Sequence, residues 1–382
     1  MSDDVLNEAL DRIRLAADVL IVSISKLNIR GTGFMNQADL NFKLALAYYI
    51  QCDNISASNY LTEARKAIVN SQTDMIYLDI LTYWEGVFAT GQTFNERLLS
   101  MDDKQMLLFE IMSWYSVMPF NEILPQYQEA LSCITKGNLI YCSRKMYTNS
   151  SGFPEFTVNY DEEKKLNYVD IKGSKKLYYP HQDKETVLGK VKTAYYLEQV
   201  PYSPHLYFTN DFNVMEGDVF CDIGAAEANQ ALEVAEKCSE IYIFEGEEYW
   251  NAALQASFSP YKEKTTIINK MVSDVSSDKY VKLDEYFSDK KVDFLKIDVE
   301  GYEMNVLRGA ENVLANNKMK LCVCTYHRGN DAREIKGFLV NHGFKTEFSD
   351  GFMVSPYNSD YWIGSELNYP YFRYGLIRAW KE

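Results

Sequence analysis

The chain has 382 residues and a formal net charge of −15. This length exceeds one ordinary compact domain, so two domains are the first expectation. Such an acidic chain repels phosphate backbones, which argues against a nucleic-acid partner and favours a neutral or cationic ligand. No run approaches the roughly 20 apolar residues of a membrane helix, and the start MSDDVLNEAL lacks the pattern of a signal peptide. The seven cysteines have no paired spacing, which predicts reduced thiols and a cytoplasmic location.

Residues 1–135 have the apolar spacing of helices. The pattern begins with Val5, Leu6 and Leu10 and returns in LNFKLALAYYIQ, SASNYLTEARKAIV and DKQMLLFEIMSWYSVM. Short polar connectors between these segments suit antiparallel hairpins. No second copy occurs at a fixed period, so the sequence predicts a helical bundle rather than a repeat array.

The period changes over residues 136–204. LIYCSRKMYT, FTVNYD and YVDIKGSKKLYYP are typical of short strands, and Lys172-Gly173-Ser174 is a turn signal. This part of the chain is predicted to be a small antiparallel β-layer or a connecting region.

Strands alternate with helix-length segments over residues 205–382. This pattern predicts a mostly parallel sheet with helices on both faces. Ligands bind such sheets outside the carboxyl ends of the strands. Cys322 and Cys324 lie in the apolar run KLCVCTYH and have no second pair, so they are expected to be packed strand residues rather than metal ligands. The other strands are expected in DVFCDIG, EIYIFEG, TTIINKMVS and VDFLKID.

The first of these strands leads into CDIGAAEANQAL, where Asp222 and Gly224 begin a tight turn before a helix. Free amide groups in such a turn can face a ligand. A dinucleotide-binding loop would have the pattern G-x-G-x-x-G, whereas here Ala226 and Ala228 follow the single glycine. The loop therefore argues against pyrophosphate and suits a ligand without phosphates.

The second strand leads into IYIFEGEEYW and places Glu245 directly after an apolar run. An acidic side chain at this position can accept both hydroxyls of a ribose. The alternative is a solvated acidic loop, because two further glutamates follow. Ala225, Ala226 and Gly246 belong to the same two loops and complete the candidate cofactor site.

The segment VDFLKIDVEGYEMNVLRGA, residues 292–310, places Lys296, Asp298 and Glu300 at alternate positions. On a strand, such residues share one face. Burying isolated charges is costly, so these groups need partners, water or a ligand. Asp298 and Glu300 are expected to flank a substrate, and Lys296 to keep one carboxylate ionised. The alternative is an internal salt-bridge network.

His327 follows the next strand in CTYHRGND. Histidine is the natural acid–base group near neutral pH, although a single histidine is more often structural. Asp298, Glu300 and His327 could also supply oxygen and nitrogen ligands to Mg²⁺ or Mn²⁺, so a divalent metal stays open as an alternative.

With these motifs in place, residues 214–354 resemble the FkbM family of S-adenosylmethionine-dependent methyltransferases. The resemblance is carried by VFCDIGA, IYIFEG, LDEYF and FLKIDVEGYEMNVLRGA. It implies a class I methyltransferase (Rossmann-like) α/β fold over residues 205–382, preceded by the helical domain and the small β-layer. The last strand of that fold is antiparallel and is expected in FRYGLIRAWK.

The resemblance also implies S-adenosylmethionine as cofactor, with Asp222 and Gly224 in its loop and Glu245 on its ribose. Asp298, Glu300 and Glu303 match the family's signature, and His327 matches a polar residue after the next strand. The chain departs from the family at Ala226 and Ala228, where relatives often have a polar residue and a glycine, which puts cofactor affinity in question.

The predicted activity is methylation of a hydroxyl, of a sugar in a surface glycan or of a secondary metabolite. Asp298 is preferred slightly over His327 as the base, and Glu300 holds the acceptor or orients the base. The aromatic segment 356–375 could form an acceptor wall, or it could pack in a core or a homodimer contact. Two rival hypotheses are a non-catalytic scaffold and a dinucleotide-linked oxidoreductase, the latter disfavoured by the missing glycines.

Overall fold

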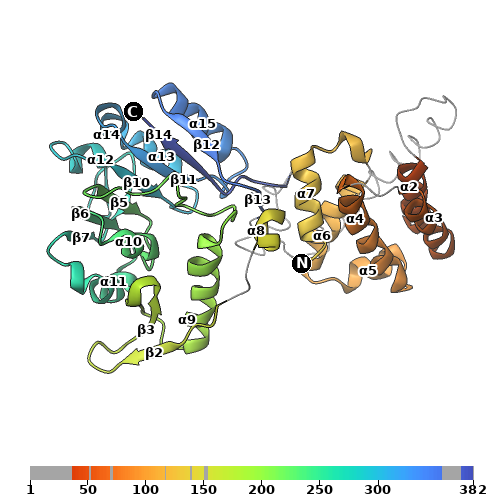
Figure 1. Ribbon diagram of the computed structural model, residues 1–382, viewed down its shortest axis with the longest axis horizontal. Helices are drawn as coiled ribbons and strands as arrows, with labels where there is room; N and C mark the ends of the chain where they lie inside the picture. The colour runs from red at the N-terminus through yellow and green to blue at the C-terminus, as the bar shows by residue number, and fades with distance from the viewer. Residues whose placement is uncertain are drawn as a thin grey trace. The chain divides into compact units, whose positions relative to one another are not determined.

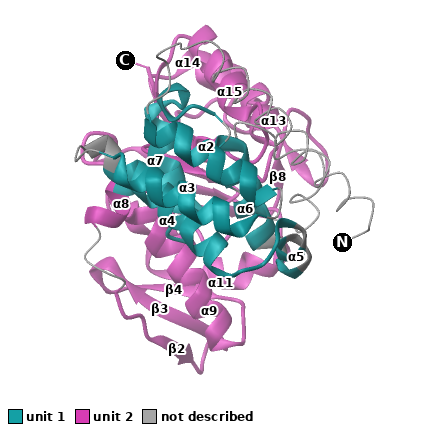
Figure 2. Ribbon diagram, turned by 90° about the vertical axis from the view of Figure 1, so that its right-hand side faces the viewer, with its two compact units in different colours: residues 1–144, 354–372 teal, residues 145–353, 373–382 magenta. Residues whose placement is uncertain are grey.

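The computed structural model describes residues 37–50, 53–68, 72–116, 118–137, 140–149, 154–354 and 371–381. The chain divides into two compact units (Figure 2). Unit 1 is Met1–Arg144 with Val354–Phe372, and unit 2 is Lys145–Met353 with Arg373–Glu382. The helix predicted near the N-terminus and most of the aromatic segment 356–375 lie outside the described residues. Among the described helices, none has the length and apolar character needed to cross a membrane.

The described part of unit 1 up to Ile134 is helical, as the apolar spacing predicts (Figure 1). Asp53 begins one helix by accepting the backbone N–H of Ser56, and Thr93 and Glu96 form a capping box at another. Trp84 is buried at the centre of an aromatic core. The elements are α2 (Gln37–Ile50), α3 (Asn54–Lys66), α4 (Gln72–Ala89), α5 (Phe94–Ser100), α6 (Asp103–Ser116), η1 (Phe120–Glu122) and α7 (Pro125–Ile134).

The predicted β-layer is a three-stranded antiparallel sheet in unit 2. Its last turn uses Gly173, whose φ of +77° favours glycine. The expected first strand is short, because residues Arg144–Asn149 form helix α8 rather than continuing it. The sequence-based division set 136–204 apart, whereas the sheet belongs to the same compact unit as the larger sheet. The elements are β1 (Tyr141–Cys142), β2 (Val158–Asp161), β3 (Leu166–Ile171), η2 (Lys172–Ser174), β4 (Lys175–Tyr179), α9 (Lys184–Lys190) and the π-helical η3 (Val191–Leu197).

The main sheet of unit 2 has seven strands in the order β12-β14-β11-β10-β5-β6-β7. Strand β14 is antiparallel to both neighbours and the other pairs are parallel. This is the class I methyltransferase sheet expected from the sequence, and its antiparallel strand lies in the predicted segment FRYGLIRAWK. The strands are β5 (Val219–Ile223), β6 (Glu240–Phe244), β7 (Thr265–Ile268), β10 (Phe294–Ile297), β11 (Lys320–Cys324), β12 (Lys345–Phe348) and β14 (Leu376–Trp380).

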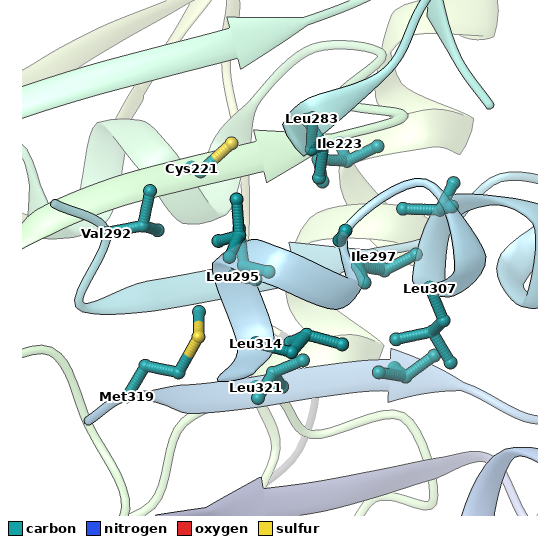
Figure 3. Close-up of a cluster of buried hydrophobic side chains, with 14 of the residues drawn as sticks. Cys221, Ile223, Leu283, Val292, Leu295, Ile297, Leu307, Leu314, Met319 and Leu321 are labelled. Atoms are coloured by element: carbon teal, nitrogen blue, oxygen red, sulfur yellow. The ribbon is translucent and has the colours of Figure 1, made fainter. Parts of the chain in front are cut away.

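Both faces of this sheet are covered, which explains why its strands are almost continuously apolar. On one face Leu295 and Ile297 pack against Leu307 and Leu314 from two helices (Figure 3). On the other face Phe294 contacts Phe208 and Phe212, which precede the sheet. The remaining elements are α10 (Asn229–Val234), η4 (Glu248–Trp250), α11 (Asn251–Ser257), η5 (Ser259–Tyr261), β8 (Met271–Val272), β9 (Tyr280–Val281), α12 (Leu283–Tyr286), α13 (Glu303–Arg308), α14 (Glu311–Asn316), α15 (Asp331–Asn341) and β13 (Phe352–Met353).

Strand β5 lies between β6 and β10, so the strand order reverses where β5 meets β10. Open α/β sheets bind ligands outside the carboxyl ends of their strands at this kind of reversal. The candidate site residues predicted from the sequence lie at the carboxyl ends of β5, β6, β10 and β11 or in the loops that follow them.

Candidate functional site

The turn after β5 depends on Gly224, whose φ is +71°. A Cβ atom at this position would lie 1.8 Å from the backbone oxygen of Asp298. Only glycine permits so close an approach. The glycine therefore allows the chain leaving β5 and the chain leaving β10 to touch at the point where the strand order reverses.

Ala226 and Ala228 also have positive φ values, of +46° and +55°. Glycine adopts this conformation freely, whereas an L-residue pays about 1–2 kcal/mol. The two positions at which the sequence departs from the FkbM pattern thus keep the sharply turned backbone despite their methyl groups. The two alanines therefore add backbone strain to the loop but leave its turn in place.

Glu245 directly follows β6 and is buried. Its carboxylate accepts the backbone N–H of Ala226 at 2.8 Å and the backbone N–H of Glu247 at 2.8 Å. Burial raises the pKa of Glu245, and these two hydrogen bonds oppose that rise. The side chain therefore ties the loop after β5 to the loop after β6 and places a carboxylate between them.

Lys296 and Asp222 form a buried ion pair across β10 and β5, with 3.1 Å between Nζ and Oδ1. The Lys296 ammonium also donates to the backbone oxygen of Gly224 at 2.7 Å. Burial raises the pKa of Asp222, an effect that the ammonium opposes. The sequence assigned Lys296 to the carboxylates that follow it. In the structure Lys296 contacts Asp222 and the turn directly, and its charge also helps to lower the pKa of Asp298, as the sequence-based expectation required.

Asp298 follows β10 and is partly accessible, with 18% of its side chain exposed. Its Oδ2 accepts the Tyr207 hydroxyl at 2.8 Å, and its Oδ1 lies 3.6 Å from Nε2 of His327. Burial would raise the pKa of Asp298, but Lys296, His205, His327 and the Tyr207 hydroxyl together lower it to about 2. Asp298 is therefore ionised at neutral pH and is a weak proton acceptor by itself.

His327 lies beside three carboxylates. Its Nδ1 is 2.9 Å from Oε1 of Glu303, and its Nε2 is 3.3 Å from Oε2 of Glu300. Burial lowers the pKa of His327, but Glu300, Glu303 and Asp298 outweigh burial and raise it to about 10. The ring is consequently an imidazolium at neutral pH, which speaks against His327 as a free base in this state.

Glu300 does not share a strand face with Lys296 and Asp298, which corrects the sequence-based expectation. Strand β10 ends at Ile297, and Glu300 lies in a turn with φ of +53°. Its side chain is 70% exposed while it contacts His327. Glu300 therefore stands at the rim of the site rather than inside it.

Glu303, which the sequence noted only as part of the signature, is buried. Its Oε1 accepts the backbone N–H groups of Val299 at 3.0 Å and Gly301 at 3.3 Å, so it fixes the turn after β10. Donor atoms of Asp298, Glu303 and His327 lie within 4.8 Å of one another. The sequence predicted Asp298, Glu300 and His327 as possible metal ligands, whereas in the structure Glu303, not Glu300, completes this group. The His327 ring already supplies a positive charge among these carboxylates.

Sequence reasoning missed two groups, His205 and Tyr207. Both lie in the segment SPHLYF before β5, outside any motif, and both are buried against Asp298. The available signal was a histidine, one of only four in the chain, beside a tyrosine at the start of the α/β pattern.

Comparisons with known proteins find one matching protein family and several similar solved structures. Residues 179–346 match the sequence profile of the methyltransferase FkbM domain. Methyltransferase FkbM from Methylobacillus flagellatus KT aligns at 17% identity and a TM-score of 0.36, over 47% of this chain and 48% of that one. The chain thus spans about half the length of that protein.

Two further solved structures align over 44% of this chain. Precorrin-6y C5,15-methyltransferase from Geobacter metallireducens GS-15 has 14% identity, a TM-score of 0.31 and 83% of its length covered. Magnesium protoporphyrin IX methyltransferase from Synechocystis PCC 6803, solved with bound S-adenosylmethionine, has 13% identity, a TM-score of 0.29 and 71% covered. No curated protein sequence matches the chain.

Proposed function

Because residues 179–346 form a methyltransferase FkbM domain, we propose that the chain transfers a methyl group from S-adenosylmethionine to a hydroxyl group. The observation that carries this proposal is that the loops after β5, β6 and β10 contact one another where the strand order reverses. There the Gly224 turn touches the backbone of Asp298, and Glu245 binds the backbone of the same loop.

The residues at this edge fit the cofactor. S-adenosylmethionine has a ribose, an adenine and a sulfonium cation, but no phosphate. The carboxylate of Glu245 lies where an acidic residue accepts ribose hydroxyls. Because the cofactor has no pyrophosphate, the loop can carry the methyl groups of Ala226 and Ala228 in a turn where a dinucleotide-binding loop is rich in glycine. Oδ1 of Asp298 is a buried carboxylate oxygen with no hydrogen-bond partner among the described residues. These features suit a cationic ligand with free hydroxyls.

The proposed methyl transfer needs side chains that position the acceptor hydroxyl and take up its proton. When bound, the cofactor supplies an electrophilic methyl group, and the protein must aim the acceptor oxygen at it. Positioning of this kind contributes about 7–11 kcal/mol to lowering a barrier. Asp298 is the proposed acceptor of the hydroxyl proton, a role that typically contributes about 10²–10⁴-fold. The exposed Glu300 binds the acceptor at the rim, and His327 balances the negative charge of the carboxylates.

We assign the acceptor to the class of sugar hydroxyls, in a surface glycan or a secondary metabolite. Two features support the assignment: the resemblance to the FkbM family and the exposed carboxylate of Glu300, which can accept hydrogen bonds from several hydroxyls. A divalent metal is not needed for this chemistry, because the ammonium of Lys296 and the His327 ring already offset the carboxylates.

Calorimetric titration with S-adenosylmethionine tests the proposal. The unaltered protein should bind, and Glu245→Gln should bind about 10–100-fold more weakly, because a charged hydrogen bond contributes roughly 1.5–3 kcal/mol. Glu248→Gln is the matched control: Glu248 is exposed in the same loop and its loss should leave the affinity unchanged. No binding by the unaltered protein at millimolar cofactor would favour the scaffold, and binding of a nicotinamide dinucleotide instead would favour the oxidoreductase.

A further inference from the structure

We infer that Glu198, His205 and Tyr207 form a proton relay behind Asp298, which removes the proton of the methyl acceptor to a cavity on the far side of the site. The inference rests on the proposed function for its direction of proton flow. None of the three residues belongs to a motif that the sequence revealed.

The relay is continuous in its distances. The Tyr207 hydroxyl donates to Oδ2 of Asp298 at 2.8 Å and lies 3.0 Å from Nε2 of His205. On the other side of the ring, Nδ1 of His205 is 3.2 Å from Oε1 of Glu198, a close polar contact that falls outside hydrogen-bond geometry. Both His205 and Tyr207 are buried, so water does not compete for these contacts. The nearby Glu198 carboxylate favours Nδ1 as the protonated nitrogen of a neutral ring. Nε2 is then an acceptor, to which the Tyr207 hydroxyl can donate only when it turns away from Asp298.

A metal ion is the alternative occupant of this cluster, because donor atoms of His205, Asp298 and Cys324 lie within 4.8 Å of one another. The Tyr207 hydroxyl, however, already lies within hydrogen-bonding reach of all three, at 3.0 Å, 2.8 Å and 3.4 Å respectively. It stands between the groups that would have to bind the ion. The geometry therefore favours a hydrogen-bond network centred on Tyr207.

Glu198 gives the relay an exit. It lines a cavity of about 460 Å³ in unit 2, together with Tyr207, Gln230 and Arg378. Gln230 donates to Oε2 of Glu198 at 3.1 Å, which holds the carboxylate with its other oxygen toward His205. A proton that reaches His205 thus arrives beside a carboxylate that borders a space large enough for water.

The relay also answers a difficulty in the mechanism. Asp298 has a pKa of about 2, so a proton taken from a hydroxyl should not rest on it. In the proposed step the acceptor oxygen bonds to the methyl carbon while the carbon–sulfur bond breaks and its electron pair stays on sulfur. The hydroxyl proton passes to Asp298, which then donates a proton to the Tyr207 oxygen while the Tyr207 hydroxyl turns its own proton from Asp298 to Nε2 of His205. The resulting imidazolium donates from Nδ1 to Glu198, and the proton then leaves to water.

The hydrogen-bond arrangement can be tested without substrate or cofactor. The chain has only four histidines, so ¹⁵N-histidine labelling of the full protein gives four pairs of ring-nitrogen signals that single substitutions assign. When the ring of His205 carries a single proton, that proton should be on Nδ1, and Tyr207→Phe should shift its Nε2 signal. His327 serves as an internal reference, because it should keep its charged form up to a pH of about 10.

Substitutions at Glu198 give the sharpest comparison. Glu198→Ala should move the His205 proton from Nδ1 to Nε2, whereas Glu198→Gln keeps an acceptor oxygen and should retain the Nδ1 form. Glu233→Ala is the matched control, since Glu233 lines the same cavity but pairs with Lys172. A His205 ring protonated on Nε2 in the unaltered protein, or one insensitive to Glu198→Ala, would overturn the relay whatever the cofactor titration shows.

Turnover supplies a second readout. With methyl-labelled S-adenosylmethionine and a panel of simple methyl glycosides, Tyr207→Phe should lower kcat by about 10²–10⁴-fold and leave the affinity for S-adenosylhomocysteine unchanged. Unchanged kcat in this variant would contradict the relay. If no glycoside is methylated by the unaltered protein, the acceptor class fails, and the nitrogen spectra alone decide whether the relay exists.

Discussion

Gly224→Ala should abolish binding of S-adenosylmethionine and lower the free energy of unfolding of unit 2 by about 4 kcal/mol or more, the size expected when a core clash and backbone strain combine. The added methyl group would lie 1.8 Å from the backbone oxygen of Asp298 and 2.9 Å from a methyl group of Val299. Since one obstacle is backbone, no side-chain rotation relieves the clash. The ends of β5 and β10 must separate, and both halves of the candidate site move with them.

Gly217→Ala provides the matched control for this prediction. Gly217 precedes β5 in the same unit, also has positive φ, at +84°, and has open space where a Cβ would be. This variant should pay only the backbone penalty of about 1–2 kcal/mol and should bind cofactor normally. Denaturant unfolding and calorimetry measure both quantities. Equal losses of stability in the two variants would show that the β5 and β10 ends do not touch as described.

Lys296→Met should destabilise the protein by about 3–5 kcal/mol, because removing one partner of a buried ion pair leaves the other charge uncompensated. Asp222 is fully buried, and Lys296 is its ion-pair partner at 3.1 Å. Methionine has a similar length, so the loss measures charge rather than a cavity. In this variant Asp222 should be protonated more readily in the folded state than in the unfolded state, so stability should fall as the pH rises above about 4.

The double variant Asp222→Asn with Lys296→Met separates the charge effect from packing. It removes both charges and should recover most of the stability lost by Lys296→Met, with a flatter pH dependence. The measurement is thermal unfolding of the unaltered protein and of these two variants as a function of pH. Failure of the double variant to recover would mean that Lys296 acts mainly through its hydrogen bond to Gly224 rather than through the ion pair.

Much of the fold could be predicted because local patterns and sheet topology agree. The alternating strands and helices after Pro204 gave the mostly parallel sheet, and the apolar spacing gave the helices of unit 1. Local patterns could not show which compact unit a segment distant in the sequence belongs to. The described residues Val354, Tyr371 and Phe372 belong to the compact unit of the N-terminal helices, although they lie between strands of the other unit in the sequence.

The candidate site shows the same division. The residues at the strand ends could be identified from the sequence, because burying a charge next to an apolar run costs free energy unless the charge has a partner or a ligand. Their partners could not be identified in this way. Strand alternation predicted one face for Asp298 and Glu300, but the chain leaves the sheet after Ile297 and turns at Glu300. His205 and Tyr207 lie about 90 residues before Asp298, as the separation of 91 between Tyr207 and Asp298 shows, so no local spacing relates them.

The central claim is that the carboxyl ends of β5, β6 and β10 bind S-adenosylmethionine. Its most direct test is a crystal structure of the unaltered protein with S-adenosylhomocysteine. The account predicts ribose hydroxyls on the Glu245 carboxylate, the amino-acid part beside the Gly224 turn, and the sulfur directed toward Asp298. Ligand bound elsewhere, for example in the cavity that Glu198 and Arg378 line, with Glu245 still closed on the backbone of Ala226, would contradict it.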